Sequence, residues 1–348
     1  MSADHVNHES SAAPVPAVSS ASAFASGRRR AIHAIVAIAV ALLALSLFAE
    51  AGLRFNRMRA RQQTAQLTIP DPCKSLIFLT MGDSMTWGLG ADHATQSYPA
   101  RFPEHFEEHY RLLDAKTVNL GVPGTNTSEG INMLRAFLDV HPDPGIDYAL
   151  IMYGVNNRWN LHEATFWEWD ERARDANYGE YLNSKLQLDK VFKIAAQNRS
   201  EAVREVTRTQ GGAFRRALDE HGWDMFFNSF EDELLSRWIE RDLGTLIEIL
   251  KGIGAQPILL TYHFDRFGHL NDIIRRAADA ASVPIVDVEQ PMTYYAERRF
   301  FDKDFFHLNQ DGYDELAARV ADGLGTDEWR DAFWERWKTK SEKCQASK

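Results

Sequence analysis

Hydrophobic residues in this chain fall into short runs that are separated by longer stretches of mixed polarity. Five runs of four to seven residues are apolar enough for buried strands, and they span 75–81, 117–120, 148–153, 257–262 and 284–288. Segments with helix-like spacing lie at 98–113, 128–138, 270–281 and 311–322. Short buried strands that alternate with helices predict a parallel sheet with helices on both faces. In such an α/β fold, ligands bind at the carboxyl ends of the strands.

The longest apolar stretch lies near the N-terminus, from Ala31 to Ala49, directly after three arginines. At about 1.5 Å per residue, a helix of this length just crosses a hydrocarbon core of roughly 30 Å. This stretch is apolar almost all round, whereas a helix on the core of a soluble domain has a polar face. We therefore expect a disordered tail at 1–30, a transmembrane signal anchor at 31–53, a linker at 54–72 and a folded domain at 73–348.

Two properties of the apolar segment stay open. The triplet Ala49-Glu50-Ala51 is a small-x-small site at which signal peptidase can cut, although the length of the stretch favours an uncleaved anchor. Arginines also follow the segment, at positions 54, 57, 59 and 61, as densely as they precede it. The positive-inside rule therefore gives no orientation.

An unusually long segment, about 158–254, separates the third predicted strand from the fourth. A plain crossover between parallel strands needs far less chain. We expect a helical insertion over the strand ends, whose many aromatic residues form a small core of their own or line an acyl or sugar pocket. Near the C-terminus, Trp329, Trp334 and Trp337 have helical spacing and indicate a packing stripe.

The charge and the cysteine content limit the kinds of partner and cofactor to be expected. The formal net charge is −10, and no basic cluster interleaved with aromatics occurs in the folded part, so we expect no nucleic acid partner. Cys73 and Cys344 lie near the two ends of the folded part without metal-ligand spacing. They are either free thiols or, in an oxidising compartment, a disulfide. Because the sequence has neither a phosphate loop nor a His-Glu-x-x-His zinc helix, we expect no cofactor.

Candidate chemistry begins where the first predicted strand ends, at Met81-Gly82-Asp83-Ser84. An ester-cleaving serine needs an exposed hydroxyl, a base for its proton and donors that face the oxyanion. Gly82 permits a sharp turn that would present Ser84 at the rim of the sheet. Taken alone, the tripeptide is explained as well by a serine that caps a helix.

Three further motifs follow in order along the chain. The second and third predicted strands lead into 121–126 and 154–157, where a glycine N–H and the Asn156 amide could face an oxyanion or simply hold turns. Asp304 stands three residues before His307, so its carboxylate can fix the imidazole tautomer and leave Nε2 as the base. There is no Gly-x-Ser-x-Gly elbow, which counts against an α/β-hydrolase.

Together, and in this order, these motifs resemble the blocks of SGNH/GDSL hydrolases over about residues 75–324. The resemblance implies the SGNH hydrolase fold, a flavodoxin-like three-layer α/β/α sandwich with a parallel five-stranded sheet, and a serine esterase of membrane-anchored bacterial type. It implies a catalytic triad of Ser84, His307 and Asp304. It also implies an oxyanion hole formed by the N–H groups of Ser84 and Gly124 and by the Asn156 side chain. Gly124 is chosen over Gly121 because it precedes the threonine-rich start of the next helix.

The sequence departs from the family pattern at several positions. Asn157 stands where the third block usually has Asp, so any supporting role of that carboxylate is lost. Met85 replaces the usual Leu, and Leu308 stands where many anchored relatives have Pro. The long aromatic insertion is also atypical, which leaves the choice of substrate open.

Three functions remain possible at this stage. The resemblance favours hydrolysis of acyl esters, either carbohydrate O-acetyl groups or lipid-like esters, by an extracytoplasmic (periplasmic) domain anchored in the bacterial inner membrane. The same site could instead transfer the acyl group to a hydroxyl of an envelope polysaccharide. A non-catalytic glycan- or partner-binding module is the third hypothesis, and the joint presence of Ser84, Asp304 and His307 argues against it. The sequence predicts neither the acyl length nor the oligomeric state.

Overall fold

The computed structural model describes residues 33, 35–52, 55, 67–160, 233–263, 267–289, 298–301 and 307–346. The chain divides into two compact units, Met1–Gly52 and Leu53–Lys348. The first unit contains the helix Ile35–Gly52, which has 18 residues and a mean hydropathy of 2.3. This length and composition suit a membrane anchor or a signal sequence.

The second unit is built on one parallel sheet. Its five strands are β1 (Leu76–Gly82), β2 (Ala115–Asn119), β3 (Tyr148–Met152), β4 (Gln256–Leu260) and β5 (Ile285–Val286), in the spatial order β2-β1-β3-β4-β5. This is the flavodoxin-like order, in which the direction of winding reverses between β1 and β3. The predicted fold class is confirmed. The reversal point identifies the carboxyl ends of β1 and β3 as the expected ligand-binding edge.

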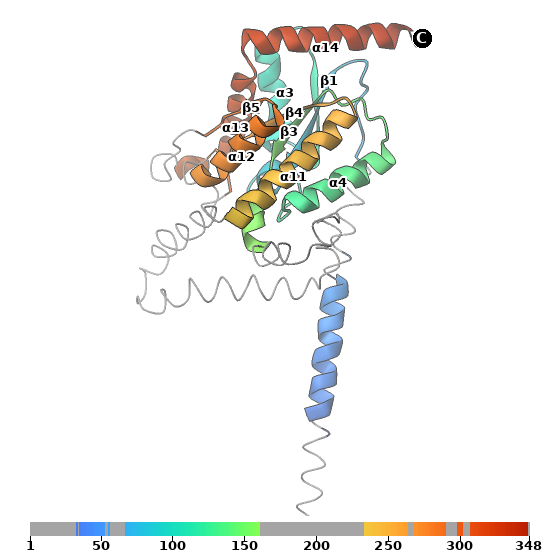
Figure 1. Ribbon diagram of the computed structural model, residues 1–348, viewed down its shortest axis with the longest axis vertical. Coiled ribbons are helices and arrows are strands. Elements are labelled where there is room, and N and C mark those ends of the chain that lie inside the picture. The colour runs from blue at the N-terminus through green and yellow to red at the C-terminus, as the bar shows by residue number, and fades with distance from the viewer. Residues whose placement is uncertain are drawn as a thin grey trace, which may run out of the picture. The chain divides into compact units, whose positions relative to one another are not determined.

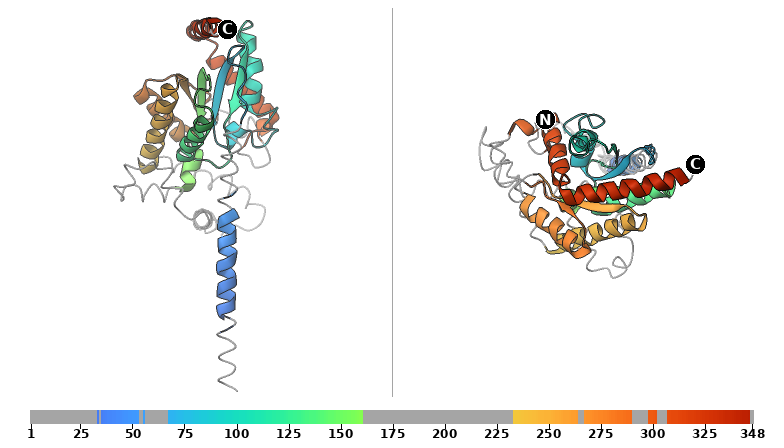
Figure 2. Two further views of the ribbon diagram at one scale, coloured as in Figure 1. Left: turned by 90° about the vertical axis from the view of Figure 1, so that its right-hand side faces the viewer. Right: turned by 90° about the horizontal axis from the view of Figure 1, so that it is seen from above.

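Helices cover both faces of this sheet (Figures 1 and 2). The helical elements are α2 (Ser84–Trp87), α3 (Tyr98–His109), α4 (Thr127–Val140), η1 (Val155–Asn160), α11 (Glu233–Gly252), α12 (Gly268–Ala281), η5 (Arg298–Phe300), α13 (Gln310–Gly323) and α14 (Asp327–Ala346). Helices α3 and α13 pack against each other on one face, and α11 packs against α4 and α12 on the other.

Every predicted strand and helix of the second unit is present, with its ends shifted by a few residues. Helix α13 begins at Gln310, and the Asn309 side chain caps it by accepting the Gly312 N–H. Helix α11 lies inside the segment that we expected to be an insertion. It packs on β4 as the crossover helix from β3. Residues 161–232 of that segment lie outside the described residues.

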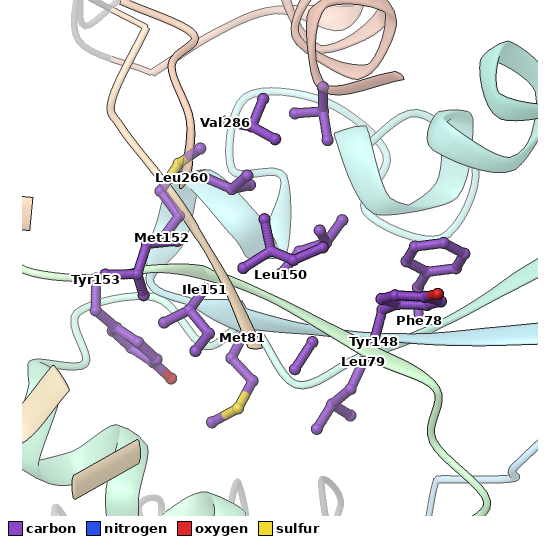
Figure 3. Close-up of a cluster of buried hydrophobic side chains, with 14 of the residues drawn as sticks. Phe78, Leu79, Met81, Tyr148, Leu150, Ile151, Met152, Tyr153, Leu260 and Val286 are labelled. Atoms are coloured by element: carbon purple, nitrogen blue, oxygen red, sulfur yellow. The ribbon is translucent and has the colours of Figure 1, made fainter. Parts of the chain in front are cut away.

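The core is formed by side chains of the strands, part of which Figure 3 shows, together with side chains of the helices. All seven residues of β1 and all five of β3 are buried. Strands that are covered on both faces need continuous apolar runs, which is the pattern seen in the sequence. On the α3 side, the Phe78 ring lies 5.0 Å from Phe102 and 5.3 Å from Phe106, in edge-to-face contacts.

Helix α14 covers the edge of the sheet at which the strands begin (Figure 1). Its buried Phe333 contacts the Tyr148 ring at the start of β3, with ring centroids 4.8 Å apart. Lys340 forms an ion pair with Asp147. Of the three C-terminal tryptophans, positions 329 and 337 pack against the core, whereas position 334 is exposed.

Cys73 and Cys344 form a disulfide that joins the residues just before β1 to the end of α14. The bond closes a loop with a sequence separation of 271 residues. Of the two alternatives that the sequence left open, the structure contains the bonded one.

We predict that Cys73→Ser combined with Cys344→Ser lowers the free energy of unfolding by about 2–5 kcal/mol, because the cross-link restricts the unfolded chain. Chemical denaturation of the full chain in detergent measures the change, with the double variant and the oxidised wild type side by side. Thiol blocking in intact cells, followed by mass analysis, tests separately whether the two cysteines are bonded. Two alkylated cysteines in the native wild-type protein would contradict the prediction.

Candidate active site

Ser84 begins the one-turn helix α2 directly after β1. A Cβ added to Gly82 would lie 1.9 Å from Thr86 Oγ1 and 2.6 Å from the Met152 carbonyl oxygen, so glycine is required for α2 to start this close to the sheet. Asp83 caps α2, with its carboxylate accepting the Met85 N–H at 2.9 Å. The serine that the sequence singled out therefore lies at the carboxyl end of β1, next to the reversal point of the sheet.

His307 reaches this serine from the other end of the chain. Its Nε2 lies 2.8 Å from Ser84 Oγ, which is hydrogen-bonding distance. The segment that carries His307 is held by a bridge between Phe301 and Leu308, and Asn309 N donates to the Phe300 carbonyl at 2.9 Å. The structure therefore brings together two of the residues that sequence motifs placed more than 200 positions apart. Asp304 lies outside the described residues.

The turn after β2 carries Gly124, which is exposed and has a φ of +77°, a backbone conformation that favours glycine. This turn is tied to the end of β1, because Val122 N donates to the Gly82 carbonyl at 3.1 Å. Asn156, in η1 after β3, donates its Nδ2 to the Thr125 carbonyl at 3.1 Å. Gly124 and Asn156 are thus connected to each other and to the β1 turn that presents Ser84.

A buried contact that the sequence analysis missed joins three strand ends. The Tyr262 hydroxyl, just after β4, donates to Asp83 Oδ2 at 2.6 Å and accepts the Val155 N–H at 3.3 Å. Both side chains are fully buried. Tyr262 therefore links the residue before Ser84 to the residue before Asn156. The signal in the sequence was weak, since a tyrosine at the end of an apolar run also suits an ordinary core position.

Burial raises the pKa of the Asp83 carboxyl from 3.8 to about 6, because desolvation disfavours its charged form. Hydrogen bonds from Tyr262 and the Met85 N–H, and the nearby His307, offset part of this increase. Another buried group, His263 after β4, has its pKa lowered to about 3, mainly by desolvation, with further electrostatic contributions from Arg319 and His307. The His263 ring is therefore neutral at pH 7.

Asn157, the departure from the family pattern, has a defined structural role. Its Oδ1 accepts the Thr127 N–H at 3.1 Å, and its Nδ2 donates to Thr127 Oγ1 at 2.7 Å. Thr127 Oγ1 in turn donates to Asp242 Oδ2 at 2.8 Å. All three residues are buried. A hydroxyl has one proton to give, and Thr127 gives it to Asp242, so Thr127 Oγ1 needs a donor, rather than a second carboxylate, at position 157.

Across the described parts of the chain, no group of three or more His, Cys, Asp or Glu side chains is arranged to hold a metal ion. The site consists instead of a serine, an imidazole and amide donors. This set of groups suits nucleophilic attack on a carbonyl, followed by proton transfer.

A family model described as the GDSL-like lipase/acylhydrolase family matches residues 80–315, which is more than half of the chain. The chain belongs to the GDSL-like lipase/acylhydrolase family. The family resemblance expected from the motifs is confirmed, and membership supports acyl-ester hydrolysis as the general activity.

Several solved structures are similar to this GDSL-family chain. They include the lipase/acylhydrolase from Enterococcus faecalis, at 16% identity over 72% of this chain and 95% of that chain, with a TM-score of 0.41. The psychrotrophic esterase EstA from Pseudoalteromonas sp. has 10% identity over 73% and 98%, with a TM-score of 0.41. Axe2, an acetylxylan esterase from Geobacillus stearothermophilus, has 15% identity over 74% and 98%, with a TM-score of 0.40. No curated protein gives a significant match.

The raised pKa of Asp83 predicts a pH dependence of stability in this GDSL-family protein. The folded state binds the Asp83 proton more tightly than the unfolded state, so this contribution is fully present below about pH 4 and is lost as the pH rises through about 6. A shift from 3.8 to about 6 corresponds to about 3 kcal/mol. Asp83→Asn removes the titration. Urea unfolding of both proteins from about pH 4 to 7 should give a difference in unfolding free energy that changes by this amount. Identical pH dependence in the two proteins would refute the prediction.

The hydrogen-bonded chain Asn157–Thr127–Asp242 predicts how the protein responds when the amide and the carboxylate are exchanged between positions 157 and 242. Asn157→Asp should destabilise the protein by about 2–4 kcal/mol, because two buried carboxylates would then compete for one hydroxyl proton. Combining it with Asp242→Asn removes one of the two carboxylates that face Thr127 Oγ1, while Ser128, Trp238 and Arg241 keep an uncharged amide in place of their carboxylate acceptor. The free energy of unfolding of the double variant should therefore be higher than the value obtained by adding the effects of the two single changes. Simple additivity in the double-mutant cycle would show that the two residues are not coupled through Thr127.

Proposed function

We propose that this GDSL-family protein hydrolyses acyl esters through a covalent acyl-enzyme, with Ser84 as the nucleophile and His307 as the general base. The observation that carries the proposal is the distance of 2.8 Å between His307 Nε2 and Ser84 Oγ at the ligand-binding edge of the sheet. A nucleophile and base within this distance are the minimum that acyl transfer by serine requires.

In the first half of the reaction, Ser84 Oγ attacks the ester carbonyl carbon while His307 Nε2 takes the hydroxyl proton. The carbonyl oxygen becomes an oxyanion. We assign its donors as the N–H groups of Ser84 and Gly124 and the amide of Asn156. The ties between the β1 turn, the Gly124 turn and Asn156 support this assignment. The tetrahedral intermediate then expels the alcohol, which receives its proton from the His307 imidazolium.

In the second half, water attacks the acyl carbon of the ester formed with Ser84, and His307 accepts a proton from that water. The tetrahedral intermediate collapses, Ser84 Oγ regains its proton and the carboxylic acid leaves. We propose Asp304 as the group that orients the imidazole. This assignment rests on its spacing from His307 and on the family resemblance. Substrates of this chemistry at a cell envelope are carbohydrate O-acetyl groups and lipid-like esters.

We also propose that the helix Ile35–Gly52 anchors the protein in the bacterial inner membrane with its catalytic domain on the periplasmic side. The disulfide supports this location, because such bonds persist in oxidising compartments and are rare in the cytosol. Thiol blocking in intact cells tests the location as well as the bond. Free thiols at Cys73 and Cys344 would place the domain in the cytoplasm.

The test of the catalytic proposal is hydrolysis of nitrophenyl acetate, butyrate and octanoate by the full chain in detergent. Ser84→Ala and His307→Asn should each lower kcat by at least about 10⁴-fold, because both residues act in one mechanism. A fluorophosphonate should add to the wild type once, at Ser84, and should not add to Ser84→Ala.

Matched controls separate catalysis from folding. Ser236→Ala in α11 and His269→Asn in α12 remove the same groups outside the site and should retain wild-type rates. Full activity in Ser84→Ala would overturn the proposal. A folded wild type that accepts the fluorophosphonate but releases no product in water would point to transfer onto an acceptor alcohol instead.

A further inference from the structure

A cavity of about 700 Å³ lies beside the candidate active site, at the open edge of the sheet formed by β2. Its volume falls within the range of small-molecule sites in proteins, roughly 300–1,000 Å³. One wall comes from α2, the start of α3 and the segment between them. The other wall comes from β2 and from Gly121, Val122 and Pro123 in the turn that follows it. Of the described lining residues, only Gly121, Val122 and Pro123 belong to the family motifs; the others lie outside them.

None of the proposed catalytic or oxyanion residues that the structure describes lines the cavity, but each of its two walls includes a residue close in sequence to one of them. Trp87, which lines it, is the last residue of α2, and Ser84 is the first. Side chains three residues apart on a helix lie on the same side, with Cβ atoms about 5–6 Å apart. On the other wall, Pro123 directly precedes Gly124, the proposed oxyanion donor. An acyl group held between Ser84 and Gly124 therefore has this cavity as a neighbour.

The polar side chains of the wall are already engaged within the protein. Thr117 Oγ1 donates to the Pro99 carbonyl at 2.7 Å, and Ser97 Oγ donates to the His93 carbonyl at 2.6 Å. Asn119 accepts the Gly121 N–H at 2.8 Å and donates to the Thr86 carbonyl at 3.0 Å. Among the described lining side chains, this leaves the His93 imidazole and the Trp87 indole N–H to bind a polar ligand, so a sugar would find few side-chain partners here.

The remaining described side chains of the lining, apart from His93, are apolar or aromatic. They are Leu67, Ala94, Pro99, Ala100, Val122 and Pro123, together with the Trp87 indole. The His93 ring stacks on the Trp87 indole, with ring centroids 4.3 Å apart and planes at 11°, which makes the cavity side of α2 a flat aromatic surface. Such walls gain free energy by removing methylene groups from water and need no directed polar contact.

We infer that this cavity binds the acyl chain of the substrate, so that the protein prefers esters of medium-length fatty acids over acetate esters. The inference rests on the proposed function, because it takes Ser84 as the attacked centre and Gly124 as the oxyanion donor. Each methylene that enters the cavity should raise kcat/KM roughly fourfold, until the cavity is filled.

Two isomeric esters distinguish binding of the acyl chain in the cavity from binding of the alcohol chain. Methyl octanoate and heptyl acetate have the same atoms, but only the first has a long acyl chain. We define the selectivity as kcat/KM for methyl octanoate divided by kcat/KM for heptyl acetate, measured with the full chain in detergent. Ala100→Phe on α3 and Ala94→Phe in the preceding loop fill the cavity from two positions. Each should lower the selectivity at least tenfold.

The control is Ala332→Phe, which adds the same ring to an exposed position on α14, at the end of the sheet where the strands begin. It should leave the selectivity unchanged. Ala94 is itself exposed, so its variant remains informative if a larger side chain at Ala100 disturbs α3. Circular dichroism and fluorophosphonate labelling of Ser84 confirm that each variant is folded and competent.

The outcomes distinguish this inference from the proposed function. A fall in selectivity for both cavity variants supports the acyl-chain site. Hydrolysis with an unchanged selectivity refutes the site alone, and a rise in selectivity refutes it by placing the alcohol chain in the cavity. If the wild type hydrolyses neither ester, the proposed function fails and the acyl-chain site fails with it.

Discussion

The close packing at Gly82 determines how the active edge of this protein is built. Without a side chain at this position, α2 starts directly above the β1–β3 pair, and Thr86 and the Met152 carbonyl occupy the space that a Cβ would need. The same glycine carbonyl accepts the Val122 N–H and so holds the turn that follows β2. A larger residue would move Ser84 and the Gly124 turn together. A single missing methyl group thus sets the separation of the two elements proposed to hold the substrate carbonyl.

A second layer of structure lies beneath the residues proposed to react. Tyr262 ties the residue before Ser84 to the residue before Asn156, and Asn157 ties the start of α4 to Asp242 on α11. These polar groups are buried, and the hydrogen bonds within each chain meet their donors and acceptors, which favours one fixed arrangement over many. Positioning of catalytic groups within fractions of an ångström requires such support. The departure at Asn157 therefore fits its own surroundings.

The strands were predictable because each is buried on both faces and is therefore a continuous apolar run, as for Tyr148–Met152. The pairing of Ser84 with His307 was predictable because the order of motifs identifies the family, although no local rule connects positions so far apart. The contact between Asp83 and Tyr262 was not predictable, since it joins residues 179 positions apart by tertiary packing alone. Helix α11 was assigned to an insertion because the length of the surrounding segment outweighed its own helical pattern.

The disulfide between Cys73 and Cys344 closes the domain into a covalent ring. A force that pulls the two ends of the chain apart passes through the sulfur bridge instead of through the strands. A single break in the backbone between the two cysteines likewise leaves both fragments covalently joined. The covalent bridge thus gives the fold mechanical and proteolytic tolerance that its hydrophobic core alone does not provide.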